Sequence, residues 1–160
     1  MQIHNIAPVY DVHSRILILG SFPSVQSRSA EFYYAHPQNR FWRVLAELTE
    51  NALPLSTTDK KQLLLTNQIA LWDVIAACEI RGSADSSIKN AAVNDIAGLV
   101  SRSSIEVVAL NGQAAAKLYK KYVQLPEIPV ICLPSTSPAN AVYSMSKLSE
   151  IWREQLQAWL

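Results

Sequence analysis

Glycine is scarce in this chain, which has four glycines among its 160 residues. Neither the G-x-x-x-x-G-K-[ST] loop of P-loop proteins nor the G-x-G-x-x-G pattern of dinucleotide sites occurs in it. The G-x-S-x-G elbow is also absent, so a serine hydrolase would rest only on scattered serines and histidines. The sequence therefore argues against these nucleotide-binding and hydrolase classes.

Metal-ligand residues are few. The chain has two cysteines, Cys78 and Cys132, and three histidines that show no metal-ligand spacing with them. Two cysteines cannot hold an iron–sulfur cluster alone, because such clusters normally take four protein ligands. We expect no cofactor, no metal site and no iron–sulfur cluster, with both cysteines as free thiols buried in apolar segments.

Long apolar runs and strong net charge are missing too. No apolar run approaches membrane length, and the N-terminal stretch MQIHNIAPVYDVHS lacks the pattern of a signal peptide. We therefore expect a cytoplasmic protein with no membrane partner. The formal net charge is +1, so nucleic-acid binding would need a local basic patch. The length favours one domain over 1–160, which we expect to be a monomer.

Four short apolar runs are bounded by turn-forming residues, as in strands that are buried on both faces of a parallel sheet. Helical patterns lie between and after them, at 40–50, 57–66, 92–101, 112–122 and 144–159. Alternating strands and helices predict an α/β protein, a three-layer α/β/α sandwich with a central four-stranded, mostly parallel sheet. The four runs are RILILG (15–20), IALWDVI (69–75), EVVALNG (106–112) and PVICLP (129–134).

Polar residues gather at the carboxyl ends of these predicted strands, where open α/β sheets bind their ligands. The long loop 21–42 after the first strand adds aromatic rings, amides and arginines. Aromatic faces stack on bases and arginines contact phosphates, so this loop could form a base pocket. The alternative is that Tyr33 and Tyr34 pack in the core and that Asn39 is only a helix N-cap.

A second loop, LPSTSPANAVYSMSK (133–147), joins the last strand to the last helix. Its hydroxyls and backbone amides could bind a phosphate near a helix N-terminus, and its Pro138–Asn140 tip could enter a duplex. The alternative is an ordinary connection built from serine and threonine turns.

Three motifs carry a resemblance to the uracil-DNA glycosylase superfamily, over nearly the whole chain. The mismatch-specific uracil/thymine branch has GINPG, then an aromatic-A-H-P-x-NRFW stretch, then LPNPSG. This chain has GSFPS (20–24), YAHPQNRFW (34–42) and LPSTSPAN (133–140). Together with LWDVIAAC and GSADSSI, these segments resemble the hypoxanthine-DNA glycosylase branch more closely.

The resemblance gives Phe22 and Asn39 particular meaning. In the mismatch branch, the middle residue of GINPG is an asparagine that positions the attacking water, and Phe22 occupies that position here. The hypoxanthine branch is understood to use the asparagine of its NRFW motif, which is Asn39. An amide would orient water or the base edge rather than take a proton, while Phe22 would wall an apolar pocket.

The resemblance thus implies a monofunctional DNA glycosylase that releases deaminated bases, most of all hypoxanthine, from DNA in base excision repair. The alternatives are uracil removal from G:U mismatches and a module that binds damaged bases or nucleotides without catalysis. The expected catalytic residue is Asn39. The expected base pocket is Ser21, Phe22, Pro23, Tyr34 and Asn111. The expected DNA contacts are Ser27, Arg28, Ser135, Thr136, Ser137, Pro138, Ala139 and Asn140.

Overall fold

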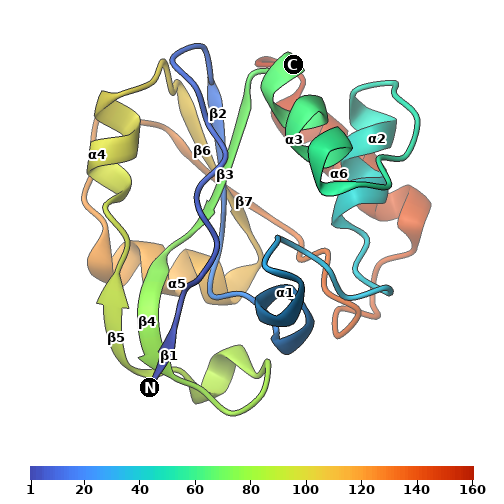
Figure 1. The fold of residues 1–160 in the computed structure, drawn as a ribbon. Helices are drawn as coiled ribbons and strands as arrows, with labels where there is room; N and C mark the ends of the chain where they lie inside the picture. The colour runs from blue at the N-terminus through green and yellow to red at the C-terminus, as the bar shows by residue number, and fades with distance from the viewer.

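The computed structural model describes residues 1–160, and its centre is a four-stranded parallel sheet (Figure 1). The strands are β2 (Ile16–Gly20), β3 (Ile69–Asp73), β6 (Val107–Asn111) and β7 (Val130–Leu133), in the spatial order β3-β2-β6-β7. These are the four predicted strands, shortened by one or two residues at their ends. β2 lies between β3 and β6, so the strand order of the sheet reverses at β2. Open α/β sheets bind ligands at the carboxyl ends of the strands beside such a switch point.

Helices cover both faces of this sheet (Figure 1). Ile16 and Ile18 of β2 pack with α2 (Phe41–Leu48), α3 (Thr57–Thr66) and α6 (Met145–Leu156). Leu17 and Leu19 point to the opposite face, toward α4 (Ile96–Ser101) and α5 (Gln113–Tyr122). This alternation follows from the two-residue period of a strand. The three-layer α/β/α class is confirmed.

A second sheet, of three antiparallel strands, was not expected from the sequence. It consists of β1 (Gln2–Ile3), β4 (Ile75–Glu79) and β5 (Lys89–Val93), in the order β1-β4-β5. The helix predicted over 92–101 is wrong at its start, because it begins at Ile96 after the N-cap Asp95. Strand β5 is mostly exposed, so it lacks the apolar pattern that identifies a buried strand. A 3₁₀ turn, η1 (Asp85–Ser87), links β4 to β5.

Two further local differences concern α1 and Cys132. Helix α1 (Val25–Ala30) interrupts the predicted loop 21–42, and the Oγ of its N-cap Ser24 accepts from Ser27 N at 3.1 Å. Both thiols are free, but only Cys78 is buried as expected. Cys132 is exposed because β7 forms the edge of the sheet. None of the helices combines the length and apolar character needed to cross a membrane.

Candidate active site

A cavity of about 550 Å³ lies at the carboxyl ends of β2, β3 and β6, the place where the topology predicts a ligand site. Its walls come from these strand ends and from residues 22–27, 33–39, 83–85 and 135–139. The structure therefore brings together most of the residues expected from the sequence. Those that line the cavity are Ser21, Phe22, Pro23, Ser27, Tyr34, Asn39, Asn111, Ser135, Thr136, Ser137, Pro138 and Ala139.

Gly20 allows two side chains to approach the end of β2. The register pairs Gly20 with Asp73 across β2 and β3. A Cβ atom on Gly20 would collide with the Asp73 carboxylate and would lie 2.9 Å from the Tyr34 Oη atom. Glycine is therefore required here for close approach rather than for a left-handed backbone.

Phe22 forms an apolar part of the cavity wall and is 7% exposed. Its ring meets the His4 ring edge-on, with centroids 6.0 Å apart, and the Arg28 Cζ atom lies 5.5 Å from its centroid. The strand-to-helix turn therefore presents an aromatic ring rather than a polar side chain at this position.

Asn39 is half-buried at the cavity edge, just before α2. Its Oδ1 accepts a hydrogen bond from Phe41 N at 2.9 Å, so the side chain does support the start of the helix. The amide NH₂ group donates to no group of the chain. The N-cap of α2 is Arg40, so the alternative that Asn39 is the N-cap is wrong by one residue. Asn39 supports the start of the helix from the preceding position with one end of its amide, and the other end is free.

Tyr34 combines a strained backbone with a buried hydroxyl. Its φ of 52° lies in the left-handed region, which costs free energy for a residue other than glycine. Phe41 stacks on its ring with centroids 4.1 Å apart, so a base could stack only on the other face. The Tyr34 hydroxyl is buried with no hydrogen-bond partner. Burial, and then the charge of Asp73, raise the pKa of Tyr34, which keeps its hydroxyl neutral.

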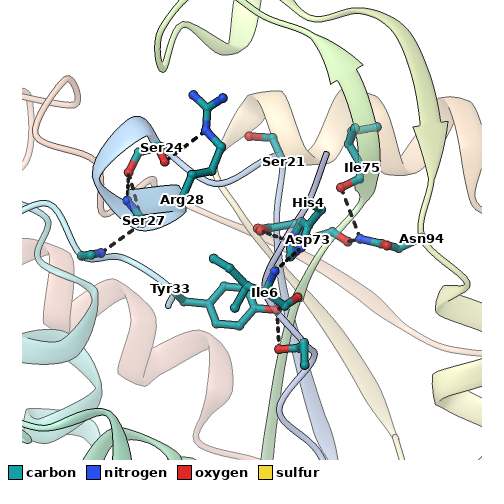
Figure 2. A network of polar contacts seen from close by, with 12 residues as sticks. His4, Ile6, Ser21, Ser24, Ser27, Arg28, Tyr33, Asp73, Ile75 and Asn94 are labelled. Carbon is teal, nitrogen blue, oxygen red and sulfur yellow. Dashed lines mark hydrogen bonds and ion pairs between the residues drawn. The ribbon is translucent and has the colours of Figure 1, made fainter. Parts of the chain in front are cut away.

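Asp73 ends β3 inside the cavity and is 3% exposed. His4 Nε2 lies 2.8 Å from Asp73 Oδ2 (Figure 2). Because His4 Nδ1 accepts from Ile6 N at 3.3 Å, the neutral ring carries its proton on Nε2 and donates it to Asp73. The N-terminal segment thus fixes the orientation of a buried carboxylate. Asp73 lies near the end of the apolar run IALWDVI (69–75), but nothing in the sequence indicated its pairing with His4.

Asp85 places a second carboxyl on the cavity wall, and the sequence did not single it out. Ser21 Oγ donates to Asp85 Oδ1 at 2.7 Å. Desolvation of the carboxyl raises the pKa of Asp85, the hydrogen bond from Ser21 lowers it, and the charge of Asp73 raises it further. The net direction is upward.

Residues 135–139 form another part of the cavity wall. Hydrogen bonds from the side chains of Asn111 and Arg40 hold this segment in place. Asn111 uses both ends of its amide on Thr136, donating to Oγ1 and accepting from the backbone N, each at 3.0 Å. Arg40 donates to the carbonyl oxygens of Tyr143 at 2.5 Å and Asn140 at 2.9 Å. Within this segment, Pro138 and Ala139 are exposed and also line the cavity.

Arg28 and Asn140 are the two expected site residues outside the main cavity. Arg28 Nη2 donates to the Gly82 carbonyl at 2.7 Å, which ties α1 to the β4–β5 connection. Asn140 Nδ2 donates to the Ser135 carbonyl at 3.0 Å, and Asn140 lines an adjoining hollow. Both side chains thus have partners within the chain. Ser27, by contrast, lines the cavity, but it is 2% exposed and its Oγ accepts from Ala35 N.

The fold and the cavity define the class as an open α/β protein with a cavity at the carboxyl ends of its parallel strands, lined by aromatic rings, amides and two carboxyls. No group of three or more histidine, cysteine, aspartate or glutamate side chains is arranged to hold a metal ion.

Comparison with known proteins identifies the family. The family model of the uracil DNA glycosylase superfamily matches residues 7–157. A hypoxanthine DNA glycosylase from Methanosarcina acetivorans is 35% identical over 144 residues, covering 89% of this chain and 90% of the relative. A hypoxanthine DNA glycosylase from Methanosarcina barkeri is 32% identical over 142 residues, covering 88% and 89%.

A solved structure agrees with these matches. The solution NMR structure of a protein from Methanosarcina acetivorans, described as a candidate uracil DNA glycosylase, superposes with a TM-score of 0.80 at 31% identity. The match covers 96% of this chain and 98% of that protein. The chain belongs to the uracil DNA glycosylase superfamily, as the sequence motifs predicted.

Proposed function

We propose that this protein is a monofunctional DNA glycosylase that hydrolyses the N-glycosidic bond of deaminated bases in DNA, with hypoxanthine as its main target. The observation that carries the proposal is the cavity wall, where Phe22 takes the place of a polar side chain and Asn39 presents a free amide. The similarity to two hypoxanthine DNA glycosylases over most of the chain supports the choice of base. The cavity volume of about 550 Å³ lies within the range of small-molecule sites, about 300–1,000 Å³.

The target base must leave the helical stack before it can reach such a cavity. Extrusion costs a few kcal/mol and costs least for a base in a weak pair, which favours deaminated bases. Once inside, the base stacks on the open face of Tyr34 and lies against Phe22, with Ser21, Pro23 and Asn111 completing the pocket. The exposed tip at Pro138 and Ala139 fills the gap in the duplex, while Ser135, Ser137, Asn140 and Arg28 lie toward the strand.

Bond cleavage proceeds through a sugar with oxocarbenium-like character, as in other glycoside hydrolyses. Asn39 orients the water that adds to C1′, with its amide NH₂ group donating to the water oxygen. The Asp73 carboxylate, fixed by His4, provides negative charge in the same cavity while positive charge develops on the sugar. No lysine lines the cavity, so hydrolysis by water is favoured over a Schiff-base lyase reaction.

Incubation with a duplex that contains one deoxyinosine, followed by alkali and strand-break analysis, tests the proposal. We expect strand breaks at the inosine and none in an undamaged duplex. Parallel duplexes with uracil opposite guanine and with xanthine measure the base range. Stable binding to the inosine duplex without strand breaks would refute the catalytic function and indicate a binding module instead.

A further inference from the structure

Two carboxyls from different elements face the same cavity. Asp73 comes from the end of β3 and Asp85 from η1, and both line the cavity with Phe22 and Tyr34. Their partners differ, because Asp73 accepts from an imidazole and Asp85 accepts from the Ser21 hydroxyl. Two carboxyls in unlike surroundings are a recurring arrangement for one ionised group and one acid.

The second oxygen of Asp85 is free. Ser21 occupies Oδ1, and no lysine or arginine forms an ion pair with the carboxyl. The other titratable groups that line the cavity are Asp73 from β3, and Tyr33, Tyr34 and His36 from the segment before α2. Desolvation and the Asp73 charge raise the pKa of Asp85 against the lowering effect of Ser21. Asp85 is exposed to solvent while it lines the cavity, and its pKa is raised relative to that of an ordinary surface carboxyl.

An acid assists this reaction because of the chemistry of the leaving group. A purine that departs from C1′ takes the electron pair of the C1′–N9 bond and leaves as an anion unless a proton reaches its ring. Hypoxanthine has an acceptor nitrogen, N7, bonded to C5, one of the two carbons that its rings share. Uracil has no acceptor nitrogen in its ring. A positioned acid in the pocket would therefore assist purine release specifically.

Resting on the proposed function, we infer that Asp85 is the general acid that protonates N7 of the extruded hypoxanthine while the C1′–N9 bond breaks. The proton leaves the Asp85 carboxyl for N7, and the bonding pair flows from C1′–N9 into the purine. Water then adds its oxygen to C1′ and releases a proton, which returns to the Asp85 carboxylate directly or through solvent. The products are neutral hypoxanthine and an abasic sugar with a C1′ hydroxyl, so atoms and charge balance.

The variant that separates this role from a structural one is Asp85→Asn. The asparagine oxygen can still accept from Ser21, so the contact between η1 and the end of β2 is kept while the transferable proton is lost. Asp59→Asn is the matched control, because Asp59 is exposed in α3 and does not line the cavity. The substrates are duplexes with deoxyinosine and with 7-deaza-2′-deoxyinosine, in which a C–H group replaces N7.

Single-turnover excision at saturating enzyme should fall by about 10²-fold or more on deoxyinosine in Asp85→Asn, the usual range for a general acid being 10²–10⁴. Asp59→Asn should match the wild type. On the 7-deaza duplex the wild type should be slow, and Asp85→Asn should cause little further loss. The wild-type rate on deoxyinosine should decline as pH rises through the Asp85 pKa, and this decline should be absent in Asp85→Asn.

Wild-type activity in Asp85→Asn on deoxyinosine would overturn the inference while leaving the proposed function intact. Equal losses in Asp85→Asn on both substrates would also overturn it, since the lost group would then not act through N7. If the wild type releases no hypoxanthine at all, the proposed function itself fails and the inference fails with it.

Discussion

Asn39 has two hydrogen-bonding ends, and substitutions can remove them separately. Its Oδ1 accepts from Phe41 N at 2.9 Å and its NH₂ group is free at the cavity. Asn39→Ala removes both ends. Asn39→Asp keeps an oxygen for Phe41 N and removes only the donor. Comparing the two variants therefore measures the helix-capping and catalytic contributions independently.

The effects on the free energy of unfolding follow from Asn39 Oδ1, which supports the start of α2. Loss of a capping side chain costs about 1 kcal/mol of unfolding free energy, and for a chain of this size that lowers Tm by about 2–4 °C. Asn39→Ala should show this decrease. Asn39→Asp should retain the wild-type Tm or exceed it slightly, because a carboxylate near the N-terminus of α2 is favourable for the helix dipole. Thermal unfolding followed by circular dichroism measures both.

The effects on the excision rate follow from the free NH₂ group of Asn39. Losing the group that holds an attacking water in place costs about 10²-fold in rate, the effect of misplacing a reacting group by about 1 Å. We expect both variants to lose at least that factor in single-turnover release of hypoxanthine. Saturating enzyme removes any contribution from weaker DNA binding by the added charge of Asn39→Asp. A fully active Asn39→Ala variant would show that Asn39 only supports the start of α2 and would refute its role in catalysis.

Three further predictions concern other parts of the chain. Gly20→Ala should abolish excision and lower Tm, because the added Cβ collides with the Asp73 carboxylate; a wild-type melting curve with full activity would contradict this. Arg28→Ala should flatten the slope of log affinity against log salt by about 0.9, the value for one phosphate contact, in titrations at several salt concentrations. An unchanged slope with a reduced Tm would instead assign Arg28 to its Gly82 contact alone. Excision should persist in EDTA and in Cys132→Ser, since the proposed mechanism uses neither a metal nor this exposed thiol. Activity that is lost in EDTA and restored by added zinc or iron would refute a metal-independent mechanism.

The sequence alone was sufficient for the parallel sheet and its class. Strands β2, β3 and β6 are buried on both faces and therefore read as short, nearly continuous apolar runs. The GSFPS and HPQNRFW motifs also indicated Phe22 and Asn39, through their resemblance to the motifs of the uracil-DNA glycosylase superfamily. The apolar runs and these motifs are both short stretches of sequence. Such local patterns depend on neighbouring residues only, so they can be read directly.

The second sheet and the carboxyl partners were decided by the tertiary structure. Strand β5 is identified by its pairing with β4 rather than by its own pattern, since it is largely exposed. His4 meets Asp73 across 69 residues and Ser21 meets Asp85 across 64. No local pattern encodes such contacts, because they exist only after the crossovers have brought the ends of parallel strands to one edge of the sheet.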